Sequence, residues 1–273
     1  MSIARSYGVR DQIRAETPLE RVAEDVRTLG YAVLESGLPA SALAHLREQF
    51  DAAHQRYVAR YGADYLRSID EFNTIRQPML ESPAFVDLAF LPVLHELLGQ
   101  LIEGSYLLNQ QNAIINPARE EYNQGAWHRD LPYQHFVSTT PLAINALFCV
   151  DDFTLDNGAT YVLPATHRQS EFPSQHFIDR HALQVAAPAG SFIVLDCMTF
   201  HRGGWNGSSA NRRAVNHVFT IPFFRSQIEM PEEVAGIPWN EEQRKLLGLV
   251  YRTPDSVADY LATRARKFGK QPA

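Results

Sequence analysis

The sequence predicts a mainly β fold with flanking helices, in which short antiparallel strands form a barrel or jelly roll. From residue 107 onward, short runs rich in Val, Ile, Phe and Leu follow one another without helical periodicity between them. Turn-forming residues separate these runs, for example at Asp156-Asn157-Gly158 and at Asn206-Gly207. Helical patterns are confined to residues before 107 and to the C-terminal end. Strands without helices between them are typical of sandwiches, barrels and jelly rolls.

The first helix begins at a capping box. Thr17 is the expected N-cap, Pro18 suits the first helical position, and a glutamate stands three residues after the cap. Apolar residues then recur at spacings of three and four up to Leu29, which gives the helix one apolar face. Gly30 ends this helix, and a short strand is expected at 31–34.

Two further helical patterns precede the strands. One begins near Pro39 and places Leu43 and Leu46 on the same side. The other covers 82–101 and is interrupted near Pro92, because a proline inside a helix removes a backbone hydrogen bond. Both patterns therefore predict helices in the N-terminal flank.

The predicted strands lie in the middle of the chain, and a last helix follows them. The strand-like runs are 107–117, 141–153, 159–163, 190–195 and 214–222. Thr253-Pro254-Asp255 begins a C-terminal helix with Val257, Tyr260 and Leu261 on one face. We predict a single domain, 1–273, with a helical flank at about 1–106, a jelly-roll core at about 107–225 and a C-terminal helical tail at 226–273.

Composition and charge narrow the class of protein. A hydrophobic content of 45% and a charged content of 21% are ordinary for a globular protein. The net charge of −6 argues against nucleic acid as a partner, because phosphate binding needs basic residues. No apolar run approaches the roughly 20 residues of a membrane span, and the N-terminus lacks the apolar region of a secretory signal. Cys149 and Cys197 lie in apolar runs and are expected to be buried thiols, so we predict a cytoplasmic protein without membrane contact.

Two short segments supply residues with metal-binding chemistry. Trp127-His128-Arg129-Asp130 places an imidazole and a carboxylate two residues apart, which in an extended segment puts both on one side. His201 ends another strand-like run and adds a second imidazole. Two histidines and one carboxylate on one face of a metal are typical of non-haem Fe(II) oxygenases. The alternative is a chance pattern of surface residues that make local hydrogen bonds.

An arginine pair follows the second histidine. Arg212 and Arg213 are adjacent at the start of a strand-like run, so their side chains face opposite ways. An arginine that points inward needs an anion, and its planar fork pairs well with the carboxylate of an organic acid. The alternative is a solvated basic pair.

These segments, together with the stretch between them, resemble one enzyme family. The stretch runs from Asp156-Asn157-Gly158 through Leu163-Pro164-Ala165-Thr166-His167, and the likeness extends over about 29–224. On these residues the chain resembles the phytanoyl-CoA dioxygenase family of Fe(II)- and 2-oxoglutarate-dependent oxygenases. The resemblance implies a double-stranded β-helix, which is a cupin-like jelly-roll barrel with iron at one mouth.

The resemblance also implies roles for particular residues. His128, Asp130 and His201 correspond to the iron ligands at the catalytic centre, and Arg212 to the partner of the distal carboxylate of 2-oxoglutarate. Asn116 matches a position near this cosubstrate. Two more polar side chains are expected on the same strand face as Asn116, namely Gln110 and Asn112.

Two positions depart from the family pattern. Ala165 stands where family members often have glycine in a turn, and Gly203 stands where they often have a hydroxyl that contacts the cosubstrate. Asp130 is retained, whereas relatives that halogenate lack this carboxylate. The resemblance therefore implies hydroxylation rather than halogenation.

The expected reaction is hydroxylation of an unactivated C–H bond of a small organic substrate, with consumption of O2 and release of succinate and CO2. Ascorbate is the expected reductant in vitro. The substrate class stays open among secondary metabolites, amino acids and lipid-like acids. Desaturation, epimerisation or ring closure by the same chemistry, and a non-catalytic metal-binding jelly-roll module, are the alternatives. Residues expected to meet the substrate are Tyr133, Gln134, Asn145, Leu147 and Trp205.

Overall fold

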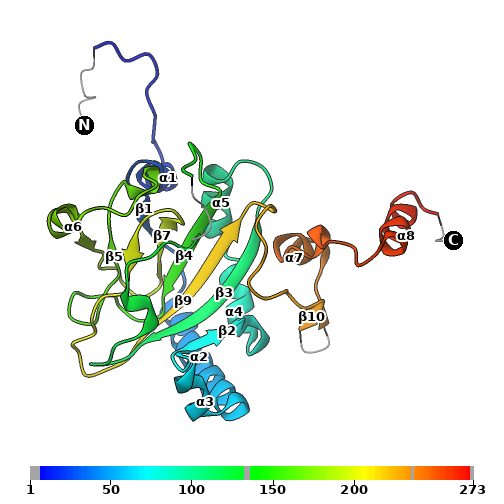
Figure 1. Cartoon of the computed structure of the whole chain (residues 1–273), viewed down its shortest axis with the longest axis horizontal. Coiled ribbons are helices and arrows are strands. Elements are labelled where there is room, and N and C mark those ends of the chain that lie inside the picture. Colours follow the sequence, from blue (N-terminus) through cyan, green and yellow to red (C-terminus); the bar gives the residue numbers. More distant parts are fainter. Residues whose placement is uncertain (1–6, 132–135, 235–236, 271–273) are drawn as a thin grey trace. The chain divides into compact units, whose positions relative to one another are not determined.

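The computed structural model describes residues 7–131, 136–234 and 237–270, which form two compact units (Figure 1). The first unit is Met1–Gln227 and the second is Ile228–Ala273. The boundary falls close to residue 225, where the jelly-roll core was expected to end. That the whole chain forms one domain stays a prediction.

The first unit is built around a six-stranded sheet in which every neighbouring pair is antiparallel. In spatial order the strands are β1 (Tyr31–Glu35), β7 (Ser191–Asp196), β4 (Ala143–Cys149), β9 (Arg212–Thr220), β3 (Leu107–Asn116) and β2 (Thr74–Arg76). The β-branched and aromatic runs predicted as strands form the five longer members. Strand β2 was not predicted, because three residues are too few for a period of two to be recognised.

A second, smaller sheet lies across the first. It contains β6 (Leu183–Gln184), β5 (Tyr161–Val162) and β8 (His201–Arg202), in that order. Apolar side chains from both sheets form a common core, including Phe153, Val162, Ile193, Leu195 and Ala214. These two antiparallel layers confirm the prediction of a mainly β fold with flanking helices.

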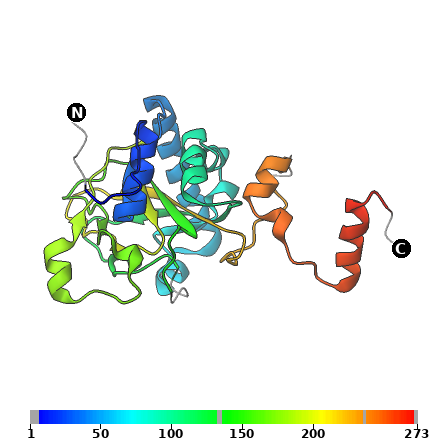
Figure 2. The ribbon, with the colours of Figure 1, turned by 90° about the horizontal axis from the view of Figure 1, so that it is seen from above.

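Helices of the N-terminal half gather on one side of the main sheet (Figure 2). They are α1 (Pro18–Leu29), α2 (Ala40–Tyr61), α3 (Ala63–Ser68), α4 (Pro83–Ala89) and α5 (Pro92–Leu101). The predicted capping box of α1 is present, since the Thr17 side chain accepts from the Glu20 backbone and the Glu20 side chain accepts from the Thr17 backbone. The predicted break at Pro92 separates α4 from α5.

The prediction that no apolar run approaches the length of a membrane span needs correction at 83–101. By length and composition this stretch of 19 residues is apolar enough to cross a membrane. It forms two helices rather than one, and Phe85, Leu88, Leu94 and Leu98 are buried inside the first unit. These side chains pack in the protein core, which accounts for the apolar composition.

Polar side chains cross the interface between the helices and the outer face of the main sheet. The backbone N–H of Met79 donates to Gln111 Oε1, and Gln111 Nε2 donates to the Phe85 carbonyl oxygen and to His217 Nε2. His217 Nδ1 then donates to the Ala146 carbonyl oxygen at 3.1 Å. Burial lowers the pKa of His217 to about 4, so this imidazole is neutral at pH 7.

The remaining elements flank this framework. Helix α6 (Gln175–His181) precedes β6, and like β2 it was not predicted. The second unit contains β10 (Glu233–Val234), β11 (Ile237–Pro238), α7 (Glu241–Leu246) and α8 (Val257–Lys267). Helix α8 confirms the predicted C-terminal helix, and its N-cap is Ser256. The predicted buried thiols are also found, since Cys149 and Cys197 are both free and buried.

Candidate metal centre

The two predicted metal-binding histidines lie directly opposite each other. The backbone N–H of His128 donates to the His201 carbonyl oxygen at 3.0 Å, and the reverse bond measures 3.1 Å. A pair that exchanges both bonds projects its two side chains to the same face of the ladder. The ring centroids of the two imidazoles are 4.4 Å apart. This antiparallel bridge brings together two residues that are distant in the sequence.

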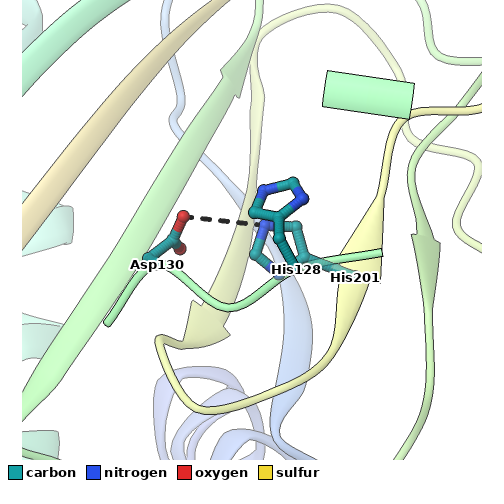
Figure 3. A group of neighbouring side chains, drawn as sticks. All are labelled: His128, Asp130 and His201. Carbon is teal, nitrogen blue, oxygen red and sulfur yellow. Dashed lines mark ion pairs between the residues drawn. The ribbon is translucent and has the colours of Figure 1, made fainter. Parts of the chain in front are cut away.

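Asp130 completes the group. Its Oδ1 lies 3.7 Å from His201 Nε2, and one ligand atom from each of the three residues lies within 4.8 Å of the other two (Figure 3). The side chains converge from the 127–131 segment and from the start of β8. Three donors converging from two segments leave the other side of a bound ion to non-protein ligands.

Hydrogen bonds fix the orientation of both imidazoles. His128 Nδ1 donates to the Ala126 carbonyl oxygen at 2.8 Å, and His201 Nδ1 donates to the Thr199 carbonyl oxygen at 3.0 Å. Each ring therefore keeps its proton on Nδ1 and presents an Nε2 lone pair. Burial lowers the pKa of His201, and the Asp130 carboxylate opposes that shift. A neutral imidazole is the form that binds a metal ion.

The Asp130 carboxylate is held from behind by two neighbours. Asn145 Nδ2 donates to Asp130 Oδ2 at 2.7 Å, and the Cys197 thiol also hydrogen-bonds this carboxylate. The backbone N–H of Asp130 donates to the Cys197 carbonyl oxygen. Because Oδ2 is occupied by the amide, Oδ1 is the oxygen turned toward the histidines. The donor set therefore fits a divalent metal ion with one carboxylate oxygen as ligand.

Arg129 stabilises the loop that contains His201. Its guanidinium donates to the backbone carbonyl oxygens of Met198, Thr166, Gln169 and Ser170. Its carbon Cζ also lies 3.7 Å from the centre of the Phe200 ring. Sequence reasoning assigned no role to Arg129, because only the folded loops bring these carbonyl groups together.

A cavity opens in front of the three ligand residues. About 450 Å³ of space lies between its walls, part of it open to solvent. Side chains from both sheets and from the loop before His128 line it, namely Ile114, Tyr122, Gln124, Asn145, Leu147, Thr160, Leu195, Arg212, Ala214 and Asn216. The cavity therefore gives a small molecule access from solvent to the three ligand residues.

Arg212 lies in the wall of this cavity and is only 4% exposed. Its Nε donates to the Asn157 carbonyl oxygen at 3.2 Å, its Cζ lies 3.6 Å from the Phe153 ring centre, and its side chain hydrogen-bonds Tyr122. Burial lowers its pKa, yet within the described residues no carboxylate forms an ion pair with it. A buried guanidinium without an anion fits an anionic ligand in the cavity.

Tyr122 lies beside Arg212 and also contacts Gly203, the position at which the family often has a hydroxyl side chain. A Cβ added to Gly203 would lie 1.9 Å from the Tyr122 hydroxyl oxygen, so a larger residue at 203 would require Tyr122 to move. Burial raises the pKa of Tyr122, which keeps the phenol protonated and able to donate. Tyr122 therefore fills the space that a Ser or Thr side chain at 203 would occupy. No sequence pattern singled out this loop residue.

The neighbouring arginine faces the other way. Arg213 donates to Asp151 through Nε and Nη2, each at 2.9 Å, and its Nη1 reaches Asp51. It thus binds two carboxylates outside the cavity, whereas Arg212 binds none within the described part of the chain. The opposite orientations follow from the alternation of side chains along β9.

The three polar residues predicted near the cosubstrate lie on β3. Asn116 Nδ2 donates to the carbonyl oxygens of Gly204 and Gly158 at 2.9 and 3.4 Å, and its Oδ1 is buried without a partner. Asn112 Nδ2 donates to Gln110 Oε1 at 3.4 Å. None of these three side chains is among the described residues that line the cavity.

The predicted substrate residues are distributed differently. Asn145 and Leu147 line the cavity, whereas Trp205 is 55% exposed and lies outside its lining. Tyr133 and Gln134 lie outside the described residues. Asn216, which lines the cavity, was missed, although its even spacing from Arg212 on one strand places both side chains on the same face.

Comparisons with known proteins agree with this geometry. The phytanoyl-CoA dioxygenase (PhyH) family model matches residues 26–214, which is more than half of the chain. An uncharacterised protein of Mycobacterium tuberculosis is 29% identical over 257 residues, covering 91% of this chain and 93% of that protein.

Solved structures share the fold. EctD from S. alaskensis, solved with 2-oxoglutarate and 5-hydroxyectoine, has a TM-score of 0.64 and 21% identity over 80% of each chain. The epimerase SnoN, solved with Fe3+, alpha ketoglutarate and nogalamycin RO, has a TM-score of 0.60 and 17% identity, covering 82% of this chain and 96% of that one. These likenesses confirm the predicted jelly-roll fold.

Proposed function

Since the chain belongs to the phytanoyl-CoA dioxygenase family, we propose that it is an Fe(II)- and 2-oxoglutarate-dependent dioxygenase. We propose further that it hydroxylates an unactivated C–H bond of a small organic substrate. One observation supports this most strongly: three converging ligand residues and an unpaired buried arginine line the same cavity. The combination provides for a metal ion and an organic anion side by side.

His128, Asp130 and His201 are the residues that would hold the iron. When bound, Fe(II) would enable O2 to oxidise the substrate, while 2-oxoglutarate is converted to succinate and CO2. The chain's own task is to present two neutral imidazoles and one carboxylate oxygen in a fixed orientation. The hydrogen bonds of Asn145 and of the two backbone carbonyl groups perform this task.

Arg212 and Tyr122 would hold the distal carboxylate of the cosubstrate. A guanidinium and a phenol side by side donate several hydrogen bonds to one carboxylate, and bonds to a charged group are stronger than neutral ones. Their fixed position orients the other end of the molecule toward the three ligand residues. Orientation of this kind lowers the barrier without a strong acid or base.

The apolar part of the cavity wall contributes by excluding water. Leu147, Leu195 and Ala214 line the cavity beside the polar residues. A wall of this kind would limit solvent access to a bound metal ion and to the substrate beside it. It also strengthens the interaction between Arg212 and its anion, because the local dielectric is low.

Succinate release tests this proposal. The purified protein is incubated with Fe(II), ascorbate, O2 and 2-oxoglutarate, and succinate is measured with and without candidate substrates. We expect succinate that depends on iron and that is absent from His201→Ala. A protein that forms no succinate with iron supplied and with any substrate tested would favour the non-catalytic metal-binding module.

The mass of the product distinguishes hydroxylation from its alternatives. Hydroxylation adds one oxygen atom, desaturation or ring closure removes two hydrogen atoms, and epimerisation leaves the mass unchanged. Retention of Asp130 favours hydroxylation over halogenation, since the carboxylate occupies the position that a halide would need. A small-molecule substrate, a cytoplasmic location, and the absence of nucleic-acid and membrane partners all stay predictions.

A further inference from the structure

Four amide side chains lie together on the inner face of the main sheet. Strands β3, β9 and β4 are neighbours (Figure 1), and side chains directly opposite one another share a face. In one row Asn112 lies opposite Asn216, which lies opposite Leu147. In the next row Gln110 and Asn145 lie on either side of Val218. We call Gln110, Asn112, Asn216 and Asn145 the amide cluster.

Two members of the cluster, Asn145 and Asn216, each bury an oxygen atom that lacks a hydrogen-bond donor. Asn145 is 3% exposed and Asn216 is 9% exposed, and the Oδ1 atom of each is buried without a hydrogen-bond partner. A buried polar atom without a partner destabilises the folded state, and native proteins contain few of them. Both residues line the cavity, so a ligand there can supply the missing donors.

The orientation of the Asn145 amide is fixed by its neighbour. Nδ2 must face Asp130, because a carboxylate only accepts hydrogen bonds. The unpaired atom of Asn145 is therefore an acceptor, and it requires an N–H or O–H group. 2-Oxoglutarate cannot provide one, since its two carboxylates and its ketone are all acceptors at neutral pH. The donor must come from another molecule.

The charge of the cavity limits what that molecule is. Among the described lining residues, Arg212 is the sole arginine or lysine, and the proposed function assigns it to the cosubstrate. Among those described residues, no second cation remains for a phosphate or carboxylate of the substrate. Amide side chains suit neutral partners, because each offers donors and an acceptor without charge.

We propose that the two members of the amide cluster that line the cavity, Asn145 and Asn216, bind a neutral polyhydroxylated substrate, such as a sugar ring, whose hydroxyl groups donate to their Oδ1 atoms. This proposal rests on the proposed function, because it takes Arg212 as the cosubstrate site. Vicinal hydroxyls both donate and accept, so they match neighbouring amides of adjacent strands. Acyl-CoA thioesters and fatty acids do not match, since they bring anionic groups and apolar chains.

Calorimetric binding to the protein loaded with Co(II) and 2-oxoglutarate tests the proposal. The probes are methyl glycosides of common hexoses, compared with octanoate and octanoyl-CoA. We expect at least one glycoside to bind and neither acyl compound to bind. Asn216→Leu keeps the branched shape of the side chain, although it is larger, and cannot hydrogen-bond, so it should weaken glycoside binding at least about tenfold.

Two further variants keep the result interpretable. Asn216→Ala removes the same cavity-lining amide by truncation and should also weaken the glycoside, even if Asn216→Leu fails to fold. Gln55→Leu removes an exposed amide on α2, outside the cavity, and should bind the glycoside like the wild type. Circular dichroism melting of each variant checks that it is folded.

The outcomes separate this proposal from the proposed function. If the wild type binds Co(II) and 2-oxoglutarate but no glycoside, the two amide oxygens are hydrated and the proposal is wrong. It is also wrong if an acyl compound binds, or if glycoside binding is unchanged in both amide variants. Failure to bind 2-oxoglutarate at all would instead contradict the proposed function.

Discussion

Arg212 and Arg213 illustrate how one position on a strand decides the role of a residue. The two side chains are chemically identical, yet Arg212 is 4% exposed and has no carboxylate partner among the residues that the structure describes, whereas Arg213 binds Asp51 and Asp151. Alternation along a strand explained their opposite orientations from sequence alone. Sequence could not reveal that Asp151 would pair with Arg213, because that contact depends on the packing of β4, β9 and α2.

We predict that Arg212→Ala weakens 2-oxoglutarate binding by at least about a hundredfold, since a charge-assisted pair in a buried site is lost. The dissociation constant is measured calorimetrically with Co(II) in place of Fe(II). Arg213→Ala is the matched control, and its main effect should be a loss of about 1 kcal/mol of stability. Equal effects of the two changes on the dissociation constant would contradict the assignment.

Tyr122 is the residue-scale feature that the sequence did not indicate. The departure at Gly203 was visible as a missing hydroxyl, but the residue that fills the space comes from a loop distant in the sequence. We predict that Tyr122→Phe weakens 2-oxoglutarate binding about five- to tenfold, because one hydrogen bond to a charged group is lost. The same calorimetric titration measures this change. An unchanged dissociation constant would show that the phenol does not reach the cosubstrate.

At the scale of elements, the predicted strands and helices were mostly found, because their apolar periodicity is long enough to be read. The elements that were missed are short, among them β2, β6, β8 and α6. Their formation depends on neighbouring strands and loops rather than on their own pattern. The turn at Ala165 likewise depends on its surroundings. Ala165 has a φ of 63°, so the turn keeps the left-handed conformation that glycine favours.

The hydrogen-bonded chain through Gln111 and His217 makes the outer face of the sheet sensitive to acid. His217 has a pKa of about 4 in the folded protein and an ordinary value of 6.5 when unfolded. Between these values the unfolded chain binds the extra proton, so the free energy of unfolding falls as the pH is lowered from about 6.5 to 4. The loss should reach about 3 kcal/mol from this group.

His217→Gln tests this prediction, because glutamine keeps a donor and an acceptor but does not titrate. Urea unfolding of both proteins is measured at pH 7 and at pH 4. We expect the wild type to lose about 3 kcal/mol more than the variant between these values. The same pH dependence in both proteins would rule out His217 as the cause.

At the scale of the whole molecule, all residues of the metal centre and of the cavity belong to the first unit, Met1–Gln227. From the sequence we expected the jelly-roll core to end near residue 225, inside a single domain over 1–273. The sequence could not indicate how His128 and His201 would meet, since that depends on the antiparallel bridge between two distant segments. The family resemblance supplied this pairing, which neither motif specifies on its own.

We predict that a protein ending at Gln227 unfolds cooperatively and binds Co(II) with an affinity within about threefold of the full chain. The physical reason is that Ile228–Ala273 contributes no described residue to the cavity. Thermal unfolding and calorimetric titration measure the two properties. Aggregation of the shortened protein, or loss of Co(II) binding, would show that the second unit is required.

A diffraction experiment on crystals soaked anaerobically with Fe(II) and 2-oxoglutarate tests the central claim most directly. The anomalous signal of iron should form a single peak, about 2.0–2.3 Å from His128 Nε2, Asp130 Oδ1 and His201 Nε2. Density for the diacid should connect this peak to the Arg212 guanidinium. An iron peak that contacts only one of the two imidazoles, or a diacid bound away from Arg212, would contradict the account.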